Sequence, residues 1–198
     1  MAQQKESVVT PERFESGMTY EQYKGHIKRN ADKFQFNYEA TKISPEDAAA
    51  LKALAARDNG PAKLLVLGED WCPDVFRGLP VLARIAEAAG LNLRVFPRDD
   101  NPDIMNEFLN HGESQSIPTA VFYTRDHRYI AHWIERPARA NAELGDIQKL
   151  FEGLDREKDA DRELMKQRYD DFQRGPTWGS WREETVREIR ELLESNTR

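Results

Sequence analysis

The apolar positions of the chain form two kinds of pattern, short runs and helical stripes. Runs at 64–67, 91–96, 120–124 and 129–134 have the length and composition of strands. Apolar residues recur every three or four positions over 19–34, 45–55, 75–89 and 104–109, which is typical of helices. The resulting order from 63 to 150, β-α-β-α-β-β-α, predicts an α/β sandwich whose last two strands form an antiparallel hairpin.

Helical patterns continue on both sides of this core. Thr19 and Gln22 have the spacing of a capping box, and Ser44-Pro45 is typical of a helix start. After the hairpin, apolar positions over 144–154, 164–172 and 178–193 predict further helices, with a break at Gly175-Pro176. We therefore predict a helical N-terminal extension over 1–60, an α/β domain over 61–150 and a helical C-terminal extension over 151–198.

Composition narrows the classes of function. With 198 residues and 39% hydrophobic content, the chain is long enough to bury one core with appended helices. A net charge of −6 argues against nucleic-acid and membrane partners, and no apolar run is long enough to span a membrane. The polar N-terminus has no signal-peptide pattern, and a single cysteine excludes an internal disulfide, so we expect a cytoplasmic protein. The four histidines lack metal-ligand spacing, so no metal site is expected.

The single cysteine, Cys72, lies between the strand over 64–67 and a helix that begins at Pro73. The positive end of that helix favours the thiolate, which predicts a pKa below the free value of about 8.5. The carboxylates of Glu69, Asp70 and Asp74 oppose this effect by repulsion. The sequence therefore indicates a candidate nucleophile and leaves the net direction of its pKa shift open.

A second signature, Ser116-Ile117-Pro118-Thr119, immediately precedes the strand over 120–124. An Ile-Pro that leads into a strand removes one ladder donor and is a candidate for a cis peptide bond. The Trp71-Cys72 turn followed 46 positions later by Pro118 resembles the thioredoxin superfamily. The segments 69–74 and 98–105 also resemble a group of bacterial thioredoxin-family proteins with a Trp-Cys-x-Asp turn.

This resemblance implies a fold and a site. The fold is a thioredoxin-like three-layer sandwich with N- and C-terminal helical extensions. The implied catalytic residue is Cys72, and a second group of residues would form the substrate groove: Trp71, Pro73, Asp74, Ile117, Pro118 and Thr119. The backbone before Pro118 would pair with a bound chain by strand addition.

Two departures from thioredoxin limit the chemistry. Val75 occupies the position of the second cysteine of Cys-x-x-Cys, and Val66 occupies the position of the buried acid of the preceding strand. A dithiol reductase is therefore excluded. The first remaining hypothesis is a monothiol, whose Cys72 attacks a disulfide or a glutathionylated thiol while an external thiol such as glutathione resolves the adduct. Its partner is a protein or peptide thiol or disulfide, or a low-molecular-weight thiol, and it needs no resident cofactor.

Other hypotheses stay open at this point. In one, the groove is a non-catalytic binding module for a peptide or protein, and the helical extensions add surface. In another, Cys72 is a peroxide-sensing thiol that is oxidised to a sulfenate. An acyl-transfer pair of Cys72 with a histidine is also open, because such partners need only meet in space.

Overall fold

A four-stranded sheet with strand order β2-β1-β3-β4 lies at the centre of the computed structural model, which describes residues 7–197. The strands are β1 (Lys63–Gly68), β2 (Asn92–Pro97), β3 (Thr119–Tyr123) and β4 (Tyr129–Ile134). β1 and β2 are parallel, whereas β3 is antiparallel to both β1 and β4. All four predicted strands and the predicted hairpin are confirmed.

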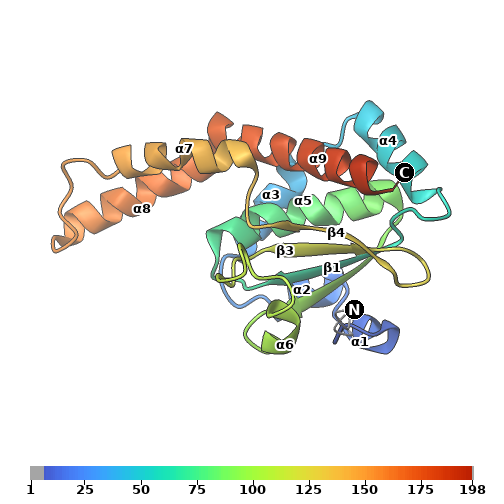
Figure 1. Cartoon of the computed structure of the whole chain (residues 1–198). Helices are drawn as coiled ribbons and strands as arrows, with labels where there is room; N and C mark the ends of the chain where they lie inside the picture. Colours follow the sequence, from blue (N-terminus) through green and yellow to red (C-terminus); the bar gives the residue numbers. More distant parts are fainter. Residues whose placement is uncertain (1–6, 198) are drawn as a thin grey trace.

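Helices cover both faces of the sheet (Figure 1). One face carries α5 (Pro73–Ala89) and α9 (Pro176–Asn196), and α3 (Ala31–Ala40) and α4 (Pro45–Ala55) pack on α5. The other face carries the short helices α1 (Pro11–Glu15) and α6 (Pro102–Met105), and α2 (Tyr20–His26) packs against β2. This arrangement confirms the predicted thioredoxin-like sandwich with helical extensions.

Helix α5 is the central helix of the fold. It begins after the N-cap residue Cys72 with Pro73 at its first position, and it ends at Gly90, whose φ of 73° is left-handed. Twelve of its 17 residues are buried. The helix is therefore covered nearly all round, by the sheet on one side and by α3, α4 and α9 on the others.

The helical pattern predicted over 19–34 is two helices, α2 and α3. The carboxylate of Asp70 accepts hydrogen bonds from the backbone N–H groups of Lys28 and Arg29, at 2.7 and 3.1 Å. Asn30 then takes a left-handed conformation with φ 60°. The chain breaks here because these N–H groups bind a side chain from the turn after β1, a contact that helical periodicity cannot predict.

The helix predicted over 104–109 is also shorter than expected. α6 ends at Met105, and the following N–H groups of Glu107 and Phe108 bond three residues back, as in turns. Phe108 is still buried, because its ring lies against Tyr129 and His132 of β4. The apolar residues Ile104, Met105 and Phe108 are buried, as their pattern predicts. Their spacing over six residues does not distinguish a helix from successive turns.

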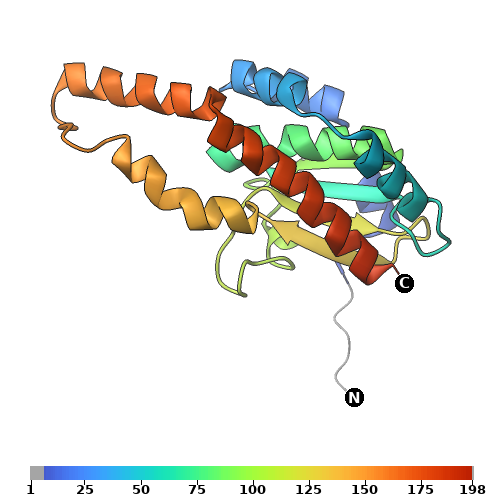
Figure 2. The same ribbon diagram turned by 90° about the horizontal axis from the view of Figure 1, so that it is seen from above.

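The C-terminal extension has two parts. Helices α7 (Ala138–Lys149) and α8 (Asp159–Arg174) form an arm that reaches past the end of the sheet (Figures 1 and 2). The predicted apolar helical face extends over 144–154, but α7 ends at Lys149. Ala140 is the one buried residue of α7. Helix α9 follows the predicted break at Gly175 and packs on α4, α5 and β4. The boundaries at 60 and 150 stay predictions, although α9 shares its core with the sheet.

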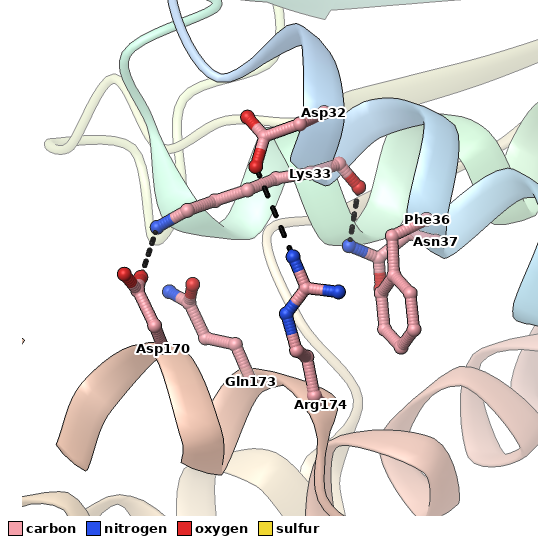
Figure 3. Close-up of a pocket in the computed structure, with 7 residues that line it drawn as sticks. All are labelled: Asp32, Lys33, Phe36, Asn37, Asp170, Gln173 and Arg174. Carbon is pink, nitrogen blue, oxygen red and sulfur yellow. Dashed lines mark hydrogen bonds and ion pairs between the residues drawn. The ribbon is translucent and has the colours of Figure 1, made fainter. Parts of the chain in front are cut away.

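Where α8 meets α3, polar side chains bridge the two extensions (Figure 3). Lys33 Nζ lies 2.8 Å from the carboxylate of Asp170, and Arg174 lies 3.9 Å from that of Asp32. The cavity between them has a volume of about 40 Å³. It is a small polar gap between the two extensions. No helix within residues 7–197 has the length and apolar character to cross a membrane.

Candidate active site

Cys72 is placed by the first turn of α5. Its carbonyl oxygen accepts the N–H groups of Val75 and Phe76 at 3.1 Å, and its own side chain makes no capping bond. The side chain is half-buried, and its Sγ donates to the carbonyl oxygen of Ile117 at 3.7 Å. The structure thus brings the thiol to the backbone of the second sequence signature.

The loop that faces the thiol is held closely against α5. The Ile117–Pro118 peptide bond is cis. A Cβ atom placed on Gly78 would lie 2.9 Å from Pro118 Cγ, so the loop approaches the helix at a residue without a side chain. Thr119 is fully buried and donates its hydroxyl to the carbonyl oxygen of Ser116 at 2.8 Å. Thr119 therefore orders the loop and does not face solvent.

Two groups of this site bear on the binding of a ligand, one without a hydrogen-bond partner and one exposed. The backbone N–H of Ile117 makes no hydrogen bond with any residue from 7 to 197. Trp71 is 45% exposed, and the guanidinium of Arg98 lies 5.2 Å from its ring centroid. An exposed aromatic ring and an unpaired backbone donor are both suited to the binding of an extended chain.

Asp74 lies in an ion-pair network with two arginines. Its carboxylate is 3.1 Å from Arg77 and 2.7 Å from Arg136. Arg136 also pairs with the carboxylate of Glu135, and Arg77 donates to the carbonyl oxygen of Glu135 at 3.3 Å. The Glu135 N–H in turn donates to the carbonyl oxygen of Pro118 at 2.7 Å.

This network connects α5, the loop after β4 and the Pro118 loop. Glu135 and Arg136 were missed from the sequence, because they follow β4 and approach Asp74 only through the topology of the sheet. The only sequence signal is their position directly after the hairpin.

Burial decides the direction of the Cys72 pKa shift. Loss of solvent and the negative charges of Asp74 and Glu135 raise the pKa of the Cys72 thiol, although the N–H groups of Val75 and Asp74 act in the opposite direction. The net direction, which the sequence leaves open, is therefore upward, against the effect of the helix N-terminus. At neutral pH the group is a protonated thiol.

A buried cation lies beneath the site. Arg77 is fully buried, and its guanidinium lies 5.4 and 5.6 Å from the ring centroids of Trp178 and Trp181 of α9. Loss of solvent lowers the pKa of Arg77 to about 10, while Asp74 acts in the opposite direction. The C-terminal helix thus supports the residue that holds Asp74.

Neither a metal nor a histidine base completes this site. In the described part of the chain, no cluster of His, Cys, Asp or Glu side chains could hold a metal ion. None of the four histidines hydrogen-bonds to Cys72 within the same residues. The acyl-transfer hypothesis therefore has no support in the geometry.

The βαβ unit, the antiparallel hairpin and a thiol at the start of α5 facing an Ile-Pro loop define a thioredoxin fold with a single cysteine. A family profile described as thioredoxin matches residues 17–150, which is more than half of the chain. The chain therefore belongs to the thioredoxin family.

Two solved structures are similar over most of their length. The first is a protein of unknown function from Pseudomonas aeruginosa, with a TM-score of 0.64, 16% identity, and coverage of 92% of this chain and 95% of the other. The second is an HIV epitope scaffold, with a TM-score of 0.60, 18% identity and the same coverage. At these identities the likeness shows the fold alone. No curated protein matches the sequence.

Proposed function

We propose that the protein is a monothiol thiol-disulfide exchange protein, with Cys72 as its nucleophile. The observation that carries this proposal is the 3.7 Å contact between Cys72 Sγ and the Ile117 carbonyl oxygen. A disulfide-bearing strand bound along the Pro118 loop brings its sulfur to the thiol. The free N–H of Ile117 and the exposed ring of Trp71 support binding of such a strand.

The exchange takes two balanced steps. The Cys72 thiolate attacks one sulfur of a disulfide, so that a mixed disulfide forms and the other sulfur leaves as a thiolate. An external thiolate, for which glutathione is the simplest candidate, then attacks the mixed disulfide and releases Cys72. The proton of Cys72 passes to solvent in the first step and returns in the second, and no net oxidation of the protein takes place.

The raised pKa sets the conditions of this reaction. Only the thiolate attacks a disulfide, so the protonated form reduces the reactive fraction at neutral pH. Intrinsic nucleophilicity rises with pKa and offsets part of this loss. The expected activity is slow at pH 7 and increases steadily through pH 9.

A second candidate function is a peptide-binding module in which Cys72 does not react. The exposed Trp71 and the Asp74 network favour it, because the network holds the groove in place without any contribution from the thiol. In that case peptide binding is unchanged in Cys72→Ser, and no mixed disulfide forms.

Mass spectrometry of the native protein incubated with oxidised glutathione distinguishes monothiol exchange from a non-reactive binding module. Monothiol exchange predicts one glutathione adduct, lost in Cys72→Ser and removed by added reduced glutathione. No adduct after extended incubation at pH 9, with a fully folded protein, overturns the exchange proposal and leaves the binding module.

A further inference from the structure

The arm formed by α7 and α8 carries large apolar side chains that the protein does not bury. No residue from Leu150 to Tyr169 is buried, although this segment includes three leucines, a phenylalanine, a methionine and a tyrosine. Exposed apolar surface with charged side chains at its margin is typical of sites that bind another protein.

An open pocket, which we call the arm pocket, lies where α8 meets the turn that follows α7. Its volume is about 190 Å³, and five residues line it: Phe151, Arg156, Met165, Lys166 and Tyr169. The three apolar side chains are half-buried and form the floor, whereas Arg156 and Lys166 are exposed at the rim. The ring of Phe151 lies 6.2 Å from that of Tyr169, so the floor includes a packed aromatic pair. The arm pocket is therefore suited to a large apolar side chain.

The two cations at the rim have no anionic partner within the described part of the chain. The side chains of Arg156 and Lys166 form no ion pair or hydrogen bond with any residue from 7 to 197. Lys158 of the same turn, in contrast, pairs with Asp155 at 3.8 Å. The rim is therefore complementary in charge to an occupant that carries a carboxylate next to its apolar side chain.

Direct contacts connect the arm pocket to the Cys72 site. The ring of Tyr169 lies 6.5 Å from that of Trp178. The same Trp178 ring lies 5.4 Å from the guanidinium of Arg77, which holds Asp74 at 3.1 Å. The arm projects beyond the end of the sheet at which α5 begins, directly after Cys72 (Figures 1 and 2). A polypeptide bound at Cys72 can therefore continue along the arm.

We propose that the arm pocket binds the protein whose disulfide is exchanged at Cys72, and this assignment rests on the proposed exchange function. A large apolar side chain of that protein enters the pocket, and an acidic neighbour pairs with Arg156 and Lys166. Oxidised glutathione has no large apolar side chain to place there. The substrate class is therefore a polypeptide with an acidic and apolar segment, and not a low-molecular-weight disulfide.

The first test is fluorescence anisotropy at pH 7 with three labelled peptides that contain no cysteine. They carry a leucine flanked by two glutamates, a leucine flanked by two lysines, and a serine flanked by two glutamates. We expect saturable binding of the first peptide. The lysine peptide binds about fivefold or more weakly because its charges are repelled, and the serine peptide about tenfold or more weakly because it has no apolar anchor.

Charge reversal at the rim tests the pocket without a change in the core. Arg156→Glu and Lys166→Glu each weaken binding of the glutamate-leucine peptide and strengthen binding of the lysine-leucine peptide. Lys158→Glu is the matched control, since it makes the same change of net charge in the same exposed turn but does not line the pocket. We expect it to leave both affinities within about twofold. Cys72→Ser leaves all of these affinities unchanged.

A second measurement links the pocket to exchange. The glutamate-leucine segment is joined by a flexible linker to a glutathionylated cysteine, and mass spectrometry follows the mixed disulfide that it forms with Cys72. At low concentration we expect this peptide to react about fivefold or more faster than oxidised glutathione. Arg156→Glu removes that advantage and leaves the rate with oxidised glutathione unchanged.

Three results overturn the assignment while exchange with oxidised glutathione remains normal. The first is equal affinity for the leucine and serine peptides, and the second is an unchanged charge preference in Arg156→Glu. The third is a dimer in sedimentation velocity that Phe151→Ser abolishes, because a second copy of the chain then occupies the pocket. Normal peptide binding with no Cys72 adduct at pH 9 overturns the exchange function instead, and with it the assignment of the bound polypeptide as an exchange substrate.

Discussion

The carboxylate of Asp74 lies 2.7 Å from the guanidinium of Arg136, and this ion pair joins the helix that begins after Cys72 to the loop that follows β4. The same carboxylate holds Arg77, a fully buried cation. Asp74 therefore has two effects, since it positions the site and its charge raises the pKa of the neighbouring thiol.

Asp74→Ala separates these two effects. Removal of one partner from a buried ion pair leaves Arg77 uncompensated, which costs about 3–5 kcal/mol in the free energy of unfolding. The pKa of Cys72 falls, because one of the charges that raise it is gone. Urea denaturation measures the first effect, and the pH dependence of alkylation measures the second.

Asp146→Ala is the control for that change. Asp146 pairs with Lys149 on the exposed surface of α7, at 2.6 Å. Its loss changes stability by no more than about 1 kcal/mol. Equal effects of the two substitutions would contradict the role given to the Asp74 network.

Gly78→Ala tests the close approach of the Pro118 loop to α5. The added Cβ lies 2.9 Å from Pro118 Cγ, whereas a Cβ at Gly145 of α7 meets no atom within 4 Å. Both substitutions gain the same helix propensity, so the difference in unfolding free energy isolates the clash. Overpacking of this kind costs about 1–3 kcal/mol, and we expect Gly78→Ala to be less stable than Gly145→Ala by that amount. An equal gain in unfolding free energy in both variants would contradict a tight contact between Gly78 and Pro118.

Trp178→Ala and Trp71→Ala compare a core tryptophan with a groove tryptophan. Trp178 is 1% exposed, and its indole N–H donates to Asn37 at 3.2 Å. Its loss costs about 3–5 kcal/mol. Trp71 is 45% exposed, so its loss changes stability by about 0.5 kcal/mol or less while it weakens binding in the groove. Thermal unfolding with a peptide-binding assay checks both, and a Trp178→Ala protein of normal stability contradicts the packing of α9 as core.

Glu69→Gln changes how stability depends on pH. Burial raises the folded-state pKa of Glu69 above its ordinary value of 4.5, so the folded protein holds this proton more tightly than the unfolded chain does. Its contribution to stability is present below pH 4.5 and is lost as pH rises through the folded-state pKa. Glu69→Gln therefore shows a smaller loss of stability over this interval than the unmodified protein. Parallel stability curves from urea unfolding between pH 4 and 7 would contradict the raised pKa.

Local sequence patterns were sufficient to predict the strands and the position of Cys72 at the start of a helix. The runs over 64–67 and 120–124 are apolar because both faces of the sheet are covered, and Pro73 marks the start of α5. The end of α2 and the side chains around Asp74 depend on contacts between residues that are distant in sequence, which local patterns could not predict. Asp70 ends α2, Glu135 and Arg136 reach Asp74 through the hairpin, and Arg77 lies against α9.

The pKa of Cys72 is also a property that local sequence patterns could not predict. A helix N-terminus is visible in sequence, and its N–H groups do act to lower the pKa of the thiol. Burial of the thiol is a property of the packed molecule, and it outweighs those groups. The sequence shows the helix dipole and the nearby carboxylates, which oppose each other, but not the loss of solvent that makes the net shift upward.

The most direct test of the central claim is the pH dependence of Cys72 alkylation in the native protein, with Cys72→Ser as the blank. The account predicts labelling without denaturant and a midpoint above the pKa of a free thiol, because burial raises the pKa of Cys72. Labelling only under unfolding conditions contradicts an accessible thiol and, with it, monothiol exchange. A midpoint near neutral pH contradicts the protonated thiol on which the expected slow exchange depends.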